Sequence, residues 1–188
     1  MIPIKGLRAN EVTELDLSNE GLGDVEARVI GGLLTVNGSL TSLDLSHNLI
    51  GDDGAKAVAG ALGVSGSLTH LDLQMNAIGA EGAKAIADAL RVNGSLTSLH
   101  VAQNEIGDDG AQAIGSALKE NKMCKLKELI LWGNEIGPDG AKALAAFCAV
   151  SGSLTLLDVR GNDIKGDGAE QLAAAVLANT TIKAFHVC

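Results

Sequence analysis

The chain has 188 residues, a typical length for one domain, and a formal net charge of −9 from 14 basic and 23 acidic side chains. This acidity argues against nucleic acid as a partner, because phosphate recognition needs clustered lysine and arginine. Hydrophobic residues make up 46% of the chain but aromatic residues only 2%, namely Trp132, Phe147 and Phe185. Leucine, isoleucine, valine and alanine must therefore form the core, and such small side chains fill only the narrow gaps between closely spaced elements.

The sequence carries no segment typical of membrane insertion or secretion. No run of about 18 apolar residues occurs, so we expect no transmembrane helix, and residues 1–5 lack the pattern of a signal peptide. Cys124, Cys148 and Cys188 are too few and too scattered for a disulfide framework or a metal site. We therefore expect a cytoplasmic protein that uses no metal, no cofactor and no membrane contact.

A unit with the spacing Leu-x-x-Leu-x-Leu-x-x-Asn recurs along the chain after an N-terminal segment of residues 1–11. The units begin at Val12, Leu40, Leu68, Leu96, Leu126 and Leu154. Successive starts are 28, 28, 28, 30 and 28 residues apart, and a partial seventh strand covers residues 182–188. The repeat predicts a single domain over residues 1–188, with one supersecondary unit in each repeat.

Each unit has two halves with different hydrophobic periods. In the first half, Leu43, Asp44 and Leu45 alternate apolar and polar side chains, which predicts a strand. In the second half, apolar residues at positions 55, 58, 59 and 62 follow the spacing of one helix face. An acidic residue precedes the helix glycine in five units, and we expect it to cap the helix. These residues are Asp53, Glu81, Asp109, Asp139 and Asp167.

Tandem strand–helix units place their strands in parallel, about 4.8 Å apart. Because helices are wider than strands, the array must bend with the strands on the inside. The sequence therefore predicts an α/β solenoid shaped as a horseshoe. Its parallel β-sheet would line the concave face, and its α-helices would cover the convex face.

The units resemble leucine-rich repeats of the ribonuclease-inhibitor type, through Leu-x-x-Leu-x-Leu-x-x-Asn-x-Ile-Gly followed by a helix rich in alanine and leucine. The amino-acid sequence of residues 39–57 is similar to the repeats of NOD-like receptors. The resemblance implies an asparagine in each unit that bonds backbone groups in the turn after the strand. The matching residues are Asn48, Asn76, Asn104, Asn134 and Asn162, and Glu20 stands in this column in the first unit.

The first candidate surface is a line of acidic residues on the predicted concave face. Strand alternation turns Leu43 and Leu45 inward and presents Asp16, Asp44 and Asp72 together on the open side. Two interpretations remain open. Either aspartate at this position simply belongs to the sequence pattern that the repeats share, or the line of aspartates forms a site for a basic partner.

His100 occupies the next position in this column, and Asp158 lies further along it. A metal site formed by His70, Asp72 and His100 is disfavoured, because parallel-strand geometry brings such residues together by accident more often than by function.

The second candidate surface contains apolar residues where other units place serine, aspartate or glutamine. These are Ile130, Trp132 and Leu156, with Arg160 beside them. Tryptophan and arginine are enriched at binding hot spots, which favours a contact patch for a partner. The alternative is a self-contained Trp132–Arg160 pair that covers local backbone.

The leading hypothesis is a non-catalytic module that binds a protein partner on its concave face. The predicted contact residues are Trp132, Ile130, Arg160, Leu156, Asp44, Asp72, His100 and Asp158. No nucleotide-binding loop or nucleophile motif occurs, so we do not expect an enzyme. The alternatives are a GTPase-activating module similar to the Ran GTPase-activating protein, a fragment of a larger receptor, and an engineered array. An open edge at the C-terminal strand also predicts a possible homodimer.

Overall fold

A computed structural model describes residues 4–187 of the chain, as seven strands alternating with seven helices. The strands are β1 (Glu14–Asp16), β2 (Ser42–Asp44), β3 (His70–Asp72), β4 (Ser98–His100), β5 (Glu128–Ile130), β6 (Leu156–Asp158) and β7 (Ala184–His186). The helices are α1 (Ile4–Arg8), α2 (Asp24–Leu34), α3 (Asp52–Val64), α4 (Ala80–Val92), α5 (Gly107–Glu120), α6 (Pro138–Cys148) and α7 (Gly166–Ala178).

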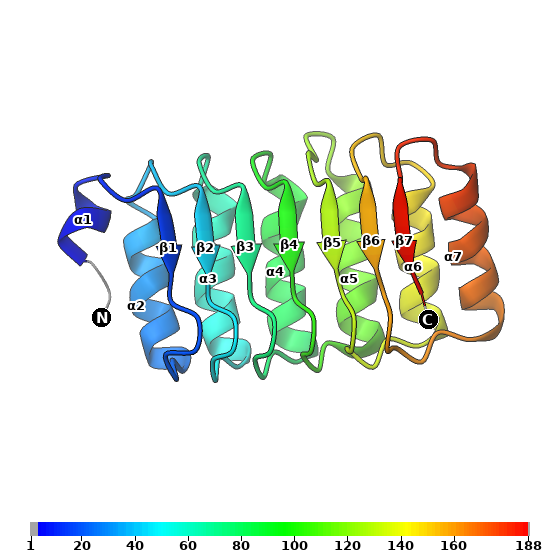
Figure 1. The fold of residues 1–188 in the computed structure, drawn as a ribbon, viewed down its shortest axis with the longest axis horizontal. Helices are drawn as coiled ribbons and strands as arrows, with labels where there is room; N and C mark the ends of the chain where they lie inside the picture. The colour runs from blue at the N-terminus through cyan, green and yellow to red at the C-terminus, as the bar shows by residue number, and fades with distance from the viewer. Residues whose placement is uncertain (1–3, 188) are drawn as a thin grey trace.

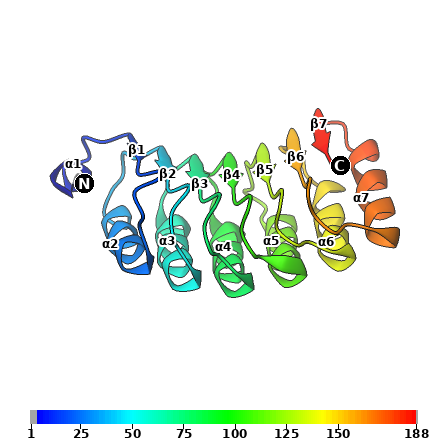
Figure 2. The same ribbon diagram turned by 60° about the horizontal axis from the view of Figure 1, so that its bottom comes forward.

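The strands form one parallel sheet in the order of the chain, from β1 to β7 (Figure 1). Figure 2 shows the strands along one side of the array and the helices along the other, with the strand side on the inside of the bend. The predicted fold class, an α/β solenoid with a concave parallel sheet, is confirmed. The 30-residue unit keeps this arrangement, because its two extra residues lie in the loop between α5 and β5.

The core is a layer of aliphatic side chains between the sheet and the helices. In each central unit, strand residues such as Leu43 and Leu45 meet helix residues such as Val58 and Leu62, all of them buried. Neighbouring helices also approach closely: a Cβ atom at Gly54 would lie 2.9 Å from the Cβ atom of Ala27 in the preceding helix. This spacing explains why so few aromatic rings occur in the chain.

The asparagine of each unit connects neighbouring turns through its amide group. Asn134 is fully buried, and its Nδ2 donates to the carbonyl oxygens of Val101 and Leu131 at 2.9 and 3.0 Å. Its Oδ1 accepts the backbone N–H of Asn104 at 3.2 Å. Asn48, Asn76, Asn104 and Asn162 make corresponding sets of bonds. This column of five asparagines therefore satisfies backbone groups and joins the successive turns that follow β1 to β6.

The helix caps differ from the prediction. Asp24 Oδ1 accepts the N–H groups of Gly51 and Gly54 at 2.8 and 2.9 Å, so the first residue of α2 caps α3 in the next unit. Asp52 and Asp108 cap the next helix in the same way. The five acidic residues predicted as caps lie one position too late. They point outward, and three of them contact a lysine three residues further on: Asp53 with Lys56, Glu81 with Lys84 and Asp139 with Lys142.

Candidate functional site

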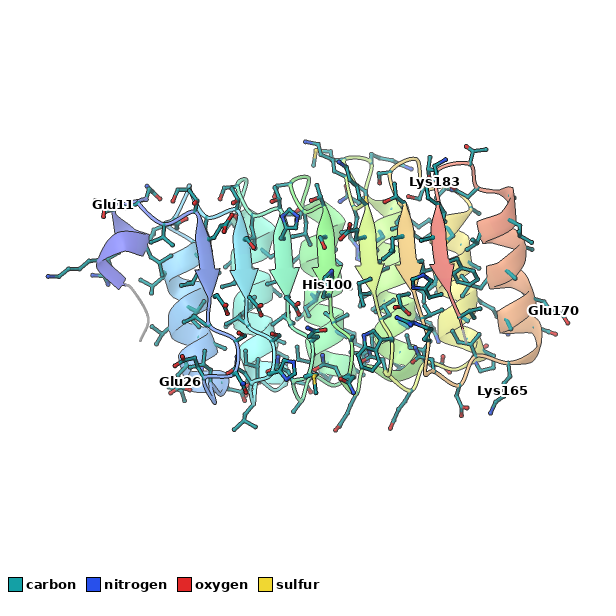
Figure 3. The ribbon with its side chains drawn as sticks, viewed as in Figure 1. Glu11, Glu26, His100, Lys165, Glu170 and Lys183 are labelled. Carbon is teal, nitrogen blue, oxygen red and sulfur yellow. The ribbon has the colours of Figure 1, made fainter. Side chains whose placement is uncertain are left out.

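Outward-facing side chains from all seven strands make up the concave face. The strand register places the residues of its middle column side by side. In strand order this row is Asp16, Asp44, Asp72, His100, Ile130, Asp158 and His186. Three of its four aspartates therefore occupy β1 to β3, the fourth lies in β6, and His100 lies at the centre of the sheet (Figure 3).

The aspartates of this row hold the turns that follow their strands. Asp44 Oδ1 accepts the backbone N–H of Ser46 at 2.8 Å. Asp16, Asp72 and Asp158 make the same bond at 2.9, 2.9 and 3.1 Å. One oxygen of each carboxylate thus binds the backbone of the repeat. This bond supports a structural reason for the recurrence of aspartate at this strand position. The second oxygen remains for other interactions.

A cavity of about 200 Å³ opens on the concave face between β2 and β4. Its walls include the side chains of Asp44, Asp72, His70 and His100. His70 Nδ1 lies 2.8 Å from Thr69 Oγ1. In the part of the chain that the structure describes, no group of three or more His, Cys, Asp or Glu side chains is arranged to hold a metal ion.

His100 is half-buried and has an acceptor near each ring nitrogen. Its Nδ1 lies 3.3 Å from Asp72 Oδ2, and its Nε2 lies 3.1 Å from Ser98 Oγ and 3.9 Å from Glu128 Oε2. The hydrogen bond with Asp72 raises the pKa of His100, and the charges of Asp72, Glu128 and Asp44 add to this rise, while burial opposes it. His100 therefore connects the acidic strands to β5.

The apolar candidates lie on the neighbouring strands β5 and β6 and in the turns after them. Ile130, Trp132 and Leu156 are half-buried, so each leaves part of an apolar side chain on the open face. Trp132 and Arg160 line a cavity of about 260 Å³. The structure thus brings Trp132 and Arg160 together, whereas Ile130 is level with Asp158 and Leu156 with Glu128 on the same two strands.

The prediction of Asp158 as an open charge for a partner is wrong. Only 4% of this residue is exposed. Arg160 folds back over it, with Nη2 at 2.6 Å from Oδ2 and Nε at 3.0 Å from Oδ1, and His186 Nδ1 lies 3.5 Å away. Burial by itself raises the pKa of Asp158, but the hydrogen bonds and charge of Arg160, helped by His186, outweigh it and lower the pKa. Asp158 therefore orients Arg160.

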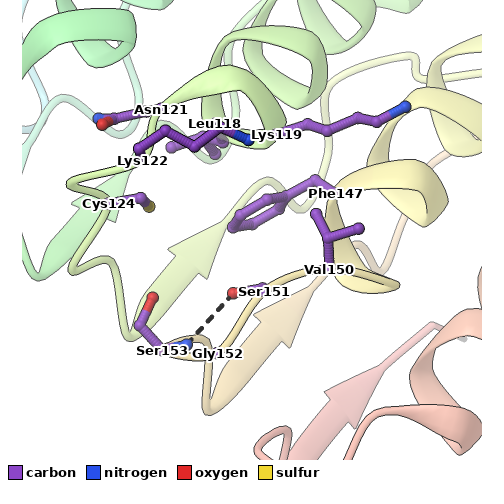
Figure 4. A pocket seen from close by; sticks show the side chains of 10 residues that line it. All are labelled: Leu118, Lys119, Asn121, Lys122, Cys124, Phe147, Val150, Ser151, Gly152 and Ser153. Atoms are coloured by element: carbon purple, nitrogen blue, oxygen red, sulfur yellow. Dashed lines mark hydrogen bonds between the residues drawn. The ribbon is translucent and has the colours of Figure 1, made fainter.

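The sequence missed a third pocket, which lies beside the 30-residue unit on a different part of the molecule. A cavity of about 230 Å³ lies beside the loop between α5 and β5. Figure 4 shows the Cys124 thiol and the Phe147 ring facing into it, with Lys119 and Lys122 at its rim. The two-residue insertion was the available signal. Cys148 is buried nearby, and burial raises the pKa of its thiol to about 12, so it behaves as a core residue.

No helix within residues 4–187 is both long enough and apolar enough to cross a membrane.

Comparison with known families matches most of the chain to one repeat family. The profile described as "Leucine Rich repeat" matches five segments that together cover more than half of the chain. These segments are residues 36–59, 65–87, 92–115, 122–145 and 151–173. No curated protein matches the sequence.

Solved structures with a similar fold include three proteins of low sequence identity. The chain is similar to leiomodin-1 actin-binding site 2, with a TM-score of 0.62 and 19% identity over 94% of this chain and 86% of that one. It is similar to the tropomodulin C-terminal domain of Caenorhabditis elegans, with a TM-score of 0.61 and 14% identity over 93% and 89% of the two chains. The third is a pollen receptor kinase 3, with a TM-score of 0.58 and 17% identity over 94% and 73%. At these identities the likeness shows the fold alone.

Proposed function

This chain belongs to the leucine-rich repeat family, and from that premise we propose that it is a non-catalytic module that recognises a protein partner on its concave face. One observation carries the proposal. The chain's single tryptophan, Trp132, stands half-buried on the open side of the sheet, next to Arg160 and two residues after the half-buried Ile130, where the units nearer the N-terminus place small or polar side chains. Apolar side chains gathered on an open surface are typical of protein contacts.

The chemistry of this patch fits a binding hot spot. Burying the exposed part of a tryptophan against a partner removes a large apolar area from water. Arg160 adds donors at the edge of the patch, and its bidentate contact with Asp158 fixes the guanidinium before binding. Preorganisation of this kind reduces the entropy that the arginine would lose on association.

The acidic strands give the same face a second property. Asp44 and Asp72 are half-buried around the cavity between β2 and β4, and Glu128 lies across β4 from them. A partner with basic side chains would complement these charges and would associate faster at low salt. The proposed partner therefore combines an apolar contact with a basic one.

The test replaces Trp132 with alanine and measures partner affinity by calorimetry. We expect a loss of about 2 kcal/mol or more. The matched control is Leu49→Ala, which removes an exposed leucine from a turn outside the patch and should leave affinity unchanged. The partner is identified by comparing proteins captured by the native chain and by a Trp132→Ala/Arg160→Ala variant. Equal affinity of native and Trp132→Ala protein for that partner would contradict the proposal.

Actin provides one defined arm of this experiment. The leiomodin-1 domain is named as an actin-binding site, and its fold covers 94% of this chain. At 19% identity, none of its contacts transfers to this chain, so actin serves as a probe. Co-sedimentation that depends on Trp132 would assign it as the partner.

We favour binding over GTPase activation. The arginine best placed to assist a GTPase, Arg160, is folded back onto the sheet by its contacts with the buried Asp158 and does not project from the concave face as an arginine finger would. A GTP hydrolysis assay with small GTPases separates the two activities, because a binding module alone leaves the rate unchanged.

Three narrower proposals accompany the main one. The repeats are of the ribonuclease-inhibitor type, in keeping with helices of 11 to 14 residues in α2 to α7.

The protein acts in the cytoplasm, in keeping with the free thiols of Cys124 and Cys148. Two copies pair through β7, the last strand of the sheet, in keeping with the strong exposure of Leu177 on α7, the last helix. Sedimentation of a monomer at high concentration would contradict the pairing.

A further inference from the structure

His100 lies between the two parts of the concave face, and every element beside it presents an acidic group. From β3, Asp72 Oδ2 approaches its Nδ1 at 3.3 Å. From β5, Glu128 Oε2 lies 3.9 Å from its Nε2, and Ser98 Oγ contacts both Nε2 and Glu128 at 3.1 Å. From β2, the carboxylate of Asp44 faces the same cavity. Among residues 4–187, no lysine or arginine lines this cavity.

The number of hydrogen bonds that the His100 ring can donate depends on its protonation state. A neutral imidazole carries one N–H and can donate on one side only, whereas the imidazolium donates to both the Asp72 side and the Glu128 side. The protonated ring therefore satisfies the surrounding acceptors better, which agrees with its raised pKa. In that state His100 supplies the positive charge that this part of the face lacks.

A cationic group from a partner would occupy the same electrostatic position. The cavity of about 200 Å³ is small compared with sites for drug-sized ligands, and it is lined by two aspartates. These dimensions and charges suit one lysine or arginine side chain rather than a whole peptide segment. A second positive charge placed beside the imidazolium would be repelled, so the partner's cation and the His100 proton compete.

We propose that the cavity between β2 and β4 takes a lysine or arginine side chain of the partner, and that protonation of His100 releases it. This inference rests on the proposed concave-face function and adds its regulation. Binding is strongest with His100 neutral and weakens as the pH falls through its titration. By linkage, a bound cation lowers the pH at which His100 takes up its proton.

The first experiment follows the His100 ring by NMR with histidine-labelled protein, with and without an oligoarginine peptide as the probe. A citrulline peptide of equal length is the uncharged control. We expect oligoarginine, but not citrulline, to shift the His100 titration to lower pH. An unchanged His100 midpoint at saturating oligoarginine would overturn the inference.

The second experiment measures oligoarginine affinity between about pH 5.5 and pH 8, where ordinary carboxylates stay ionised. If the two cations exclude each other, affinity falls by up to about tenfold for each pH unit below the His100 midpoint. His100→Gln should remove this dependence, because glutamine keeps a donor and an acceptor but does not titrate. His70→Gln is the matched control, since His70 from β3 is the other histidine that lines the cavity, and it should retain the dependence.

Failure of this inference is distinguishable from failure of the proposed function. Persistence of the same pH dependence in His100→Gln overturns the switch, whatever Trp132→Ala does to partner affinity. Asp72→Asn should weaken oligoarginine binding while its amide oxygen still accepts the turn N–H that Asp72 holds now. Undiminished binding by Asp72→Asn would overturn the cavity as the cation site.

Discussion

The two halves of the concave face share one backbone and differ in side-chain chemistry. In β2 and β3 the middle column holds Asp44 and Asp72, each bonded to the turn that follows. In β5 the same position holds Ile130, and the turn after it presents Trp132. The strand register passes from one half to the other without a shift. The outward positions are therefore free to vary, because the buried leucines and asparagines hold the strands in place.

The largest expected effect comes from breaking the scaffold common to both halves. Asn134→Ala removes the amide that joins the turns after β4 and β5 and leaves buried backbone groups without partners. We expect the free energy of unfolding to fall by about 3 kcal/mol, measured by urea denaturation. Asn76→Ala, in the acidic half, should cost a similar amount, because its Nδ2 contacts the equivalent carbonyls. A large difference between the two variants would show that the halves do not share one scaffold.

The next effect concerns the chemical difference between the halves. Ile130→Asp gives β5 the aspartate that β2 has, with the new carboxylate next to the N–H of the following turn. We expect stability to change by less than about 1 kcal/mol and affinity for the partner to fall by about 2 kcal/mol as the apolar contact is lost. Calorimetric titration and urea denaturation of the same variant measure both quantities. Retained affinity would remove Ile130 from the contact patch.

A smaller effect tests the structural use of the aspartates. Asp44→Ala removes the acceptor for the Ser46 N–H and should lower the free energy of unfolding by about 1 kcal/mol. Asp44→Asn keeps an oxygen at this place and should cost less. Equal stability of the native protein, Asp44→Ala and Asp44→Asn in urea denaturation would show that the Asp44 carboxylate does not stabilise the turn.

The smallest effect is on the pH dependence of stability. Because folding raises the pKa of His100, its contribution to stability is fully present below the pKa of the unfolded chain and is lost as the pH rises through the folded value. The melting temperature of the native protein should therefore decline slightly more between about pH 6 and pH 8 than that of His100→Gln. Scanning calorimetry at several pH values detects this difference, and parallel curves would contradict the pairing of His100 with Asp72 and Glu128.

The sequence predicted the column in which each concave residue would lie, because side-chain alternation and a repeat of 28 residues leave little freedom of register. It predicted Trp132 outside the core, on the concave face. It did not predict that Asp158 would be buried, because that burial depends on the conformation of the Arg160 side chain, which turns back to contact Asp158. The helix caps were also misplaced, because Asp24 caps the helix of the next unit, a contact between residues 30 positions apart.

Composition, periodicity and the spacing of leucine and asparagine determined the fold of this protein, since each unit repeats the same local pattern and can bury its apolar side only against its neighbours. The tertiary structure decided which charges remain available. Asp158 and Arg160 satisfy each other, whereas Asp44, Asp72 and Glu128 surround His100 at a cavity that no lysine or arginine of residues 4–187 lines. The physical reason is that charge pairing depends on the conformations of long side chains across neighbouring strands. The repeat pattern in the sequence gives the strand position of each residue but not its side-chain conformation.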